Sequence, residues 1–510
     1  MIVRVVTVAF QSIEAIPVDI QIKASHGLNT ISIVGLADKI AAESCTRIQA
    51  ALFACGLSLP LKKITVTLSP IDLPKAGSHY DLPIAIGLLI AMSLLPSAIS
   101  DHYLILGKLS LNGHVEPVEG VLPAALTALN LKRGIICPAS TGSEAAWLGT
   151  NLDILAPSGL LPLVNHFNGK QILSRPIAGT YQKGKFLGDF NEIQGQNTVK
   201  RALKVAAAGR HNLLLVEHTK AKKFMLAERF PSILPPLSAR ELLDVSLIYS
   251  LAGAISQTGI SPQRPFRAPN HSISMAAMIG GGNMARPGEV SLAHNGVLFL
   301  DDLSKFSPKV LNSLRQPLET GEITITHAKH HIRYPARIQL ISTINSCHCS
   351  LADESKPTCN CRSHYQIGQT RLSDAFLDKI DMCIHVPALD TRDLQKTSLG
   401  ASSDEILQMV IKAREIQYQR FHSMGLNYIL TNSDCPATYI KDMIDQNTKG
   451  ILEQACKKIN LSKQTYHTIL QVSRTIADLD QNPVITSRHL AEAFSYRLNL
   501  EKYRSLNLKR

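Results

Sequence analysis

The stretch from Asn212 to Ala227 has the order of elements that surrounds a phosphate-binding loop. Residues 212–216 form a short, mostly apolar run, which is typical of a buried parallel strand, and a helix opens at Lys223. Between such elements the spacing GxxxxGK[ST] binds phosphate, because glycines let backbone N–H groups approach, a lysine reaches the oxygens and a hydroxyl ligates magnesium. Lys223 stands at the lysine of this spacing and is the candidate nucleotide-binding residue.

The other positions of this loop depart from that chemistry. Glu217 and Lys222 stand where the spacing has its two glycines, and Phe224 stands at the hydroxyl. A carboxylate opposes an anion, a Cβ atom hinders the close approach of backbone to phosphate, and a phenyl ring cannot ligate magnesium. The loop therefore predicts weak binding of ATP and Mg²⁺, although its lysines still attract an anion.

A second candidate site follows the apolar strand predicted over residues 297–300. In ATPases with this order of elements, a first acid holds magnesium and a following glutamate polarises the attacking water. Asp301 and Asp302 stand at these positions. Aspartate is one methylene shorter than glutamate, and a misplacement of about 1 Å can cost roughly a hundredfold in rate. The alternative is that the two acids only cap the next turn.

Cationic residues lie between two segments of alternating apolar and polar residues, 322–326 and 332–340. This pattern predicts a hairpin whose tip carries positive charge. This tip has two interpretations: it is a solvated loop, or it contacts DNA phosphates. The candidate DNA-binding residues are His327, Lys329, His330 and His331.

Four cysteines form a C-x-C…C-x-C pattern that could bind zinc through a tetrahedron of thiolates. The spacing is tighter than the usual C-x-x-C, so reduced cysteines without a metal are the competing interpretation. The four are Cys347, Cys349, Cys359 and Cys361. Ten cysteines in 510 residues, several of them close together, favour a reducing cytosol over a disulfide scaffold.

Motifs along nearly the whole chain resemble those of the ComM (YifB) group of magnesium-chelatase-like AAA+ proteins. They occupy residues 34–38, 72–85, 266–271, 286–302, 314–319 and 377–381. The resemblance implies a hexameric ring that uses ATP and Mg²⁺, moves along DNA and promotes branch migration during uptake of transforming DNA. Insertion of magnesium into porphyrin is a further hypothesis that rests on the family name alone.

The same resemblance gives roles to four residues. Asp302 is at the Walker B glutamate position, Asn345 at sensor 1, Lys379 at the arginine finger and Gln464 at sensor 2. Lysine keeps the charge of arginine but loses its planar fork. Because these elements and the phosphate loop have changed together, we expect a pseudo-ATPase that acts on DNA. An active DNA motor with a divergent nucleotide site and a non-catalytic scaffold subunit are the alternatives.

The resemblance also relates the N-terminal part to the proteolytic domain of Lon. Hydrolysis of that type needs a serine activated by a lysine. Ser78 lies near the expected position of the nucleophile, but the position of the lysine falls at about Leu122. We therefore expect Ser78 to be inert.

The elements that position these residues predict an α/β protein. Its expected parts are a Lon-like domain (1–165), a linker (166–185), an AAA+ core with a parallel sheet (186–395) and a C-terminal helical lid (396–510). Strands are predicted over 7–10, 17–22, 63–68 and 103–112, and helices over 38–52, 82–95, 198–208, 404–422, 451–459, 463–479 and 487–498. Asp38 is expected to cap the first helix.

Charge and hydropathy limit the partners and the location. The net charge is +13, which favours a polyanionic partner such as DNA. The most apolar run, residues 82–95, is too short to span a bilayer, and the first residues have no signal-peptide pattern. We therefore expect a cytoplasmic protein with no membrane partner.

Overall fold

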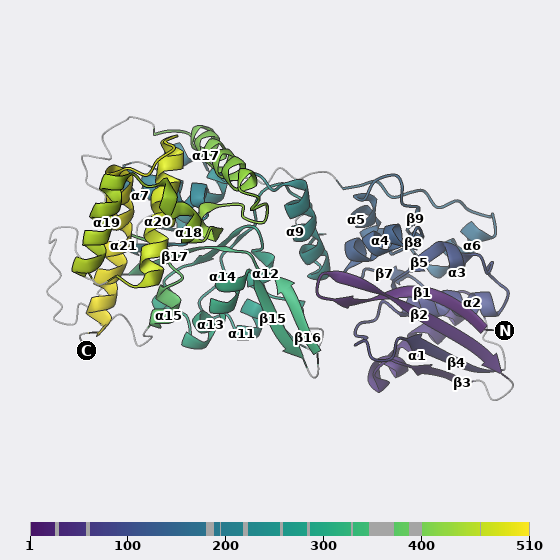
Figure 1. Ribbon diagram of the computed structural model, residues 1–510. Coiled ribbons are helices and arrows are strands. Elements are labelled where there is room, and N and C mark those ends of the chain that lie inside the picture. Colours follow the sequence, from purple (N-terminus) through teal and green to yellow (C-terminus); the bar gives the residue numbers. More distant parts are fainter. Residues whose placement is uncertain are drawn as a thin grey trace.

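The computed structural model describes residues 2–25, 30–57, 62–179, 188–193, 195–217, 223–255, 259–282, 286–327, 330–345, 372–386, 400–459 and 461–508. Figure 1 shows an N-terminal α/β region beside a second region that contains a parallel sheet and the C-terminal helices. This is the α/β class, with a parallel sheet core and C-terminal helices, that the sequence predicts.

One mixed sheet forms the centre of the N-terminal region, in the order β3-β4-β2-β1-β5-β8-β9. β1 and β2 pair antiparallel along their whole length, from Ile2 opposite Lys23 to Gln11 opposite Glu14. Every second side chain of β4 is buried, as expected for a strand with one face on a core. The strands are β1 (Ile2–Gln11), β2 (Glu14–Ser25), β3 (Thr30–Val34), β4 (Lys63–Ser69), β5 (Tyr103–Ile105), β8 (Gly134–Ile136) and β9 (Ile154–Leu155).

Helices pack against this sheet. They are α1 (Asp38–Ala54), α2 (Asp81–Ala91), α3 (Ile99–His102), α4 (Val121–Asn130), α5 (Gly142–Ala146) and α6 (Leu160–Phe167). The predicted helices over 38–52 and 82–95 are confirmed as α1 and α2, although α2 ends at Ala91. The cap prediction is wrong: Ala37 is the N-cap of α1 and makes no side-chain hydrogen bond, and Asp38 lies inside the first turn.

The strand predicted over 103–112 is two short strands. β5 belongs to the large sheet, but Gly107 donates its N–H to the carbonyl of His79, which takes the chain away from that sheet. β6 (Lys108–Leu109) then pairs antiparallel with β7 (Val115–Glu116) around the predicted turn at Asn112 and Gly113. Residues 103–112 therefore contribute one strand to the large sheet and another to the two-stranded sheet.

The second region contains a five-stranded sheet in the order β11-β14-β17-β10-β18, and every neighbouring pair is parallel. Its strands are β10 (Leu213–Glu217), β11 (Phe266–Arg267), β14 (Val297–Leu300), β17 (Gln339–Asn345) and β18 (Met382–Val386). The apolar runs 213–216 and 297–300 are buried strands, as predicted. Because all five strands are parallel, their carboxyl ends meet at one edge.

Helices and short strands surround this core sheet. The helices are α7 (Asn197–Gly209), α8 (Lys223–Arg229), α9 (Ala239–Leu251), α11 (Met275–Ile279), α12 (Glu289–Leu292), α13 (Pro308–Ser313), α14 (Arg315–Thr320) and α15 (Asp374–Leu377). β12 (Gly280–Gly281) pairs with β13 (Arg286–Pro287), and β15 (Glu322–His327) pairs with β16 (His330–Pro335). The alternation predicted over 332–340 therefore covers the end of a hairpin and the start of a core strand.

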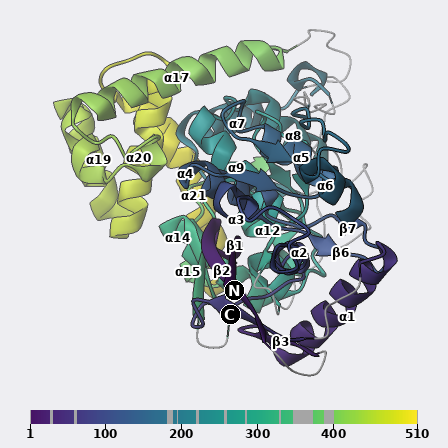
Figure 2. The ribbon, with the colours of Figure 1, turned by 90° about the vertical axis from the view of Figure 1, so that its right-hand side faces the viewer.

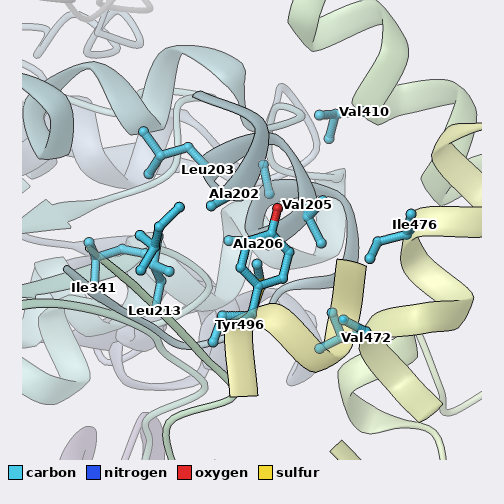
Figure 3. Packing of buried hydrophobic residues seen from close by; sticks show 14 of the residues in the cluster. Ala202, Leu203, Val205, Ala206, Leu213, Ile341, Val410, Val472, Ile476 and Tyr496 are labelled. Atoms are coloured by element: carbon cyan, nitrogen blue, oxygen red, sulfur yellow. The ribbon is translucent and has the colours of Figure 1, made fainter. Parts of the chain in front are cut away.

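The C-terminal helices share one hydrophobic core with the parallel sheet. They are α17 (Ser403–Ser423), α18 (Ala437–Ile440), α19 (Gln446–Ile459), α20 (Lys463–Leu479) and α21 (Ser487–Leu508). Figure 3 shows Val472 and Ile476 of α20 and Tyr496 of α21 gathered around α7. Figure 2 shows α17 crossing from the other C-terminal helices toward α7, against which it packs. The C-terminal helices therefore pack directly against the region that contains the parallel sheet.

No helix within the described ranges is long and apolar enough to cross a membrane. The domain boundaries at 165, 185 and 395 stay predictions.

Candidate functional site

The carboxyl edge of the core sheet gathers the residues expected at the nucleotide. β10 ends at Glu217, which lies opposite Asn345 at the end of β17. β14 ends at Leu300, so Asp301 and Asp302 follow at the same edge. The parallel register therefore brings the two acids and Asn345, the sensor-1 candidate, to the same edge.

Asp302 is completely buried, with a left-handed backbone at φ 61°. Asn345 donates from Nδ2 to its Oδ2 atom at 2.7 Å, and Ser304 donates from Oγ to its Oδ1 atom at 2.6 Å. The ammonium group of Lys305 lies 3.3 Å from Oδ2. Both oxygens of the carboxylate are thus engaged by neighbouring side chains.

Thr343 of β17 ties the two acids to the sheet. Its hydroxyl donates to Oδ1 of Asp301 at 2.8 Å and accepts the backbone N–H of Asp302 at 2.9 Å. This hydroxyl fixes the turn that directs the Asp302 side chain inward. The sequence interpretation missed Thr343, Ser304 and Lys305, although aspartate and serine both favour turns.

The phosphate-loop candidate is only partly visible. α8 begins at Lys223, as the sequence predicts for the helix after the loop. Residues 218–222 lie outside the described ranges, and so does the placement of the side chains of Glu217, Lys223 and Phe224. The role of Lys223 in binding a nucleotide stays a prediction.

Lys379 lies at the opposite, amino edge of the sheet. Its carbonyl accepts a hydrogen bond from the Asn212 side chain at 2.8 Å, and Asn212 directly precedes β10. The Lys379 ammonium group lies 2.7 Å from Oε1 of Glu319, and this pairing lowers the pKa of the Glu319 carboxyl. Lys379 therefore pairs with Glu319 and does not meet Asp301 or Asp302 of its own chain.

Gln464 is exposed in the first turn of α20 and also lies near the amino edge. The next residue, Thr465, accepts a hydrogen bond from Arg497 at 3.3 Å. Arg497 donates another to the carbonyl of Ile380, which precedes β18. Arg497 thus links the residues next to the two candidates, Thr465 beside Gln464 and Ile380 beside Lys379, at the amino edge of the sheet.

The predicted hairpin exists as β15 and β16, with His327 opposite His330. His331 is exposed, Lys329 lies outside the described ranges, and the side chains of His327 and His330 are not described. The hairpin contacts the N-terminal region: the Ser12 hydroxyl donates to the Arg333 carbonyl of β16, and one end of β1 lies near β16 in Figure 1. Its role in binding DNA stays a prediction.

The candidate zinc cysteines, 347, 349, 359 and 361, lie outside the described ranges. Within those ranges no cluster of three or more His, Cys, Asp or Glu side chains could hold a metal ion. The zinc site stays a prediction.

Ser78 lines a cavity of 810 Å³ between the N-terminal region and the core. Lys75 also lines it, but its ammonium group donates to the carbonyls of Pro70 and Leu73, and burial lowers its pKa. The buried His79 bonds the Val8 carbonyl instead, and burial lowers its pKa to about 4. Within the described residues, neither Lys75 nor His79 is hydrogen-bonded to Ser78.

Leu122, at the expected lysine position, belongs to the junction between the two regions. It is buried against Leu247, Ile255 and Ile260 of the core region. Its backbone N–H donates to Oγ of Ser250 in α9 at 3.2 Å, and Ser250 donates to the buried Glu144 at 2.9 Å. The position holds the two regions together.

Comparisons with known proteins agree with this architecture. Three family models match: "Subunit ChlI of Mg-chelatase" over residues 20–141, "Magnesium chelatase, subunit ChlI" over 189–394, and "Magnesium chelatase, subunit ChlI C-terminal" over 400–497.

Full-length relatives extend these matches. Competence protein ComM of Haemophilus influenzae is 40% identical over 501 residues, which cover 96% of each chain. The uncharacterized protein YifB of Escherichia coli is 37% identical, again over 96% of each chain. An uncharacterized protein of Mycobacterium tuberculosis is 35% identical over 97% of this chain and 98% of its own. The chain therefore belongs to the ComM (YifB) group of magnesium-chelatase-like AAA+ proteins.

Proposed function

We propose that this protein acts on DNA in natural transformation, as a ComM-type AAA+ protein that hydrolyses ATP slowly or not at all. The relative with the highest identity among those described above is named a competence protein. A net charge of +13 suits a polyanionic partner. The proposed assembly is a ring of six copies in the cytoplasm.

The engagement of Asp302 carries the pseudo-ATPase half of the proposal. A carboxylate that polarises water must present an oxygen to that water. Here Asn345 and Ser304 bond one oxygen each, Lys305 lies beside Oδ2, and the side chain is buried. The Lys305 cation beside Oδ2 opposes a role of Asp302 as the acid that polarises the attacking water of ATP hydrolysis.

The phosphate-loop sequence adds independent support. Glu217, Lys222 and Phe224 stand at the two glycines and the hydroxyl of the spacing. We expect ATP to bind much more weakly than to an intact loop. Isothermal calorimetry with magnesium present measures this directly. A dissociation constant of about 1 µM, equivalent to about −8 kcal/mol, contradicts the proposal.

The hairpin carries the DNA half of the proposal. Replacing its four cationic candidates with serine should weaken binding of single-stranded and branched DNA, because lost phosphate contacts reduce counterion release. The plot of affinity against salt should also become less steep. The four are His327, Lys329, His330 and His331. Fluorescence anisotropy at several salt concentrations measures both effects.

The matched control replaces one exposed lysine and three exposed histidines outside the hairpin: Lys412, His271, His422 and His467. An equal loss of affinity in this control assigns DNA binding to net charge and not to the hairpin. If the parent protein binds no DNA at any salt concentration, the DNA half is wrong and a scaffold role remains.

A further inference from the structure

Four arginines lie together at the amino edge of the core sheet, opposite the edge that carries Asp302. Two acids, Glu241 and Asp434, lie near them. The arginines also repel one another, because Arg264 disfavours the charged forms of both Arg210 and Arg414. Arg210 and Arg337 likewise disfavour a charged His294. The arginines are Arg210 after α7, Arg264 before β11, Arg337 before β17 and Arg414 in α17.

Two of these arginines are fully occupied by the fold. Arg264 forms a two-pronged pair with Glu241, at 3.0 and 3.1 Å, and also bonds two backbone carbonyls. Arg414 donates from Nη2 to the carbonyl of Ala207 at 2.6 Å, near the carboxyl end of α7. Cations are favourable there because the last helical carbonyls lack partners within the helix. These two side chains have structural roles.

Arg210 and Arg337 share a single carboxylate. Nη2 of Arg337 lies 2.8 Å from Oδ2 of Asp434, and Nη1 of Arg210 lies 3.7 Å from the same oxygen. Among the described residues, the guanidinium group of Arg210 donates no hydrogen bond. Its side chain is 14% exposed and that of Arg337 is 31% exposed, so both side chains are partly accessible to solvent. Two cations with many unused donors thus face one anion.

No nearby histidine or backbone feature explains this excess of charge. His294 accepts the backbone N–H of Arg337 at Nδ1, and burial lowers its pKa to about 3, so it stays neutral. Arg210 has a left-handed backbone at φ 60°, a conformation that favours glycine at the end of a helix. Burial lowers its pKa to about 10, which still leaves the group charged at neutral pH.

We propose that Arg210 and Arg337 form a binding site for a phosphate-type oxoanion. The planar fork of arginine matches the oxygens of phosphate, and two such groups converge beside Asp434 with uncompensated charge. The phosphate is either a free phosphate, including that of a nucleotide, or a phosphodiester of a nucleic acid. The site lies at the amino edge of the sheet and does not depend on the proposed function of the carboxyl edge.

The test compares the full-length parent with Arg210→Gly and Arg337→Gln. Glycine suits the left-handed backbone, so Arg210→Gly removes the cation without disturbing the chain. Arg4→Gln is the matched control, because Arg4 forms a one-to-one pair with Asp19 at 2.6 Å in the N-terminal region. One arm titrates inorganic phosphate against chloride at constant ionic strength and records the unfolding temperature. The second arm records anisotropy of a short labelled single-stranded oligonucleotide.

A free phosphate predicts that phosphate stabilises the parent and Arg4→Gln, and that both cluster variants bind it at least about tenfold more weakly. A phosphodiester predicts the same tenfold loss in the oligonucleotide arm. Equal behaviour of all four proteins in both arms overturns the proposal. It is also overturned if Arg210→Gly is less stable than the parent without phosphate and keeps the full phosphate effect, since Arg210 is then only an ion-pair partner of Asp434.

Discussion

The N-terminal region and the core each have a position where the resemblance predicts a catalytic residue but a different residue is present. The replacement is apolar in the N-terminal region and acidic in the core. Leu122 is apolar and is buried against α9 of the neighbouring region. Asp302 is an acid that remains at the sheet edge, held by Asn345 and Ser304.

The difference separates two ways of replacing a catalytic group. The Leu122 position now stabilises the junction between the two regions through apolar burial, so restoring a lysine there would damage the fold. The Asp302 position keeps a polar network whose donors and acceptors satisfy one another. Under the proposed function, neighbours in the same chain suppress its chemistry while the geometry of the edge is retained.

The first prediction has the largest effect. Leu122→Lys should destabilise the protein by about 4 kcal/mol, because a buried lysine must lose its charge or draw water into the junction. Urea unfolding measures the change, and Leu122→Met, which conserves volume, should cost under about 1.5 kcal/mol. The prediction is contradicted if Leu122→Lys is as stable as Leu122→Met or gains peptidase activity. Apolar packing at the junction would then not require this position.

The second prediction concerns pH at the same junction. Burial raises the pKa of Glu144 to about 7, although Ser250 donates a hydrogen bond to it. Because the folded pKa lies above the unfolded value, its contribution to stability is fully present below about pH 4.5 and is lost as pH rises toward 7, by on the order of 3 kcal/mol.

Glu144→Gln should remove this dependence and make the protein more stable than the parent at pH 8. The measurement is the unfolding temperature between pH 5 and 8, with the exposed Glu453→Gln as control. Parallel curves for the parent and Glu144→Gln show that the junction does not hold a neutral carboxyl group.

The third prediction is smaller and tests the core. Asp302→Ala should cost about 2 kcal/mol of stability, since Asn345 and Ser304 lose a charged acceptor. Asp302→Asn keeps the size of the side chain and tolerates the left-handed backbone, so its cost should be about half as large. Acids kept for catalysis often reduce stability, so a gain in stability on removal would favour an active site.

At the core site, the sequence predicts the strands well but the side-chain contacts poorly. Buried strands such as 213–217 and 297–300 are recognisable because continuous apolar runs between turn signals have few alternative structures. The meeting of Asp302 and Asn345 follows from the parallel order of those strands. The contacts of Asp302 with Ser304 and Lys305 do not follow from the strand order, because they depend on the side-chain directions of these residues after a turn with a positive φ.

Two other features depend on how helices and regions pack. Leu122 is predictable as buried, but the neighbour that buries it comes from 125 residues or more along the chain. The position of Gln464 depends on the direction of α20, which Arg497 helps to fix through Thr465 and the carbonyl of Ile380. Local periodicity carries no information about either contact.

Steady-state ATP hydrolysis by the purified full-length chain tests the central claim most directly. The assay is run with magnesium, with and without single-stranded and branched DNA, beside an Asp302→Ala control. We predict that the parent and the control hydrolyse ATP at the same background rate and that DNA stimulates neither. Hydrolysis by the parent at about 1 s⁻¹ or faster, lost in Asp302→Ala, would contradict the claim and establish an active motor with a divergent nucleotide site.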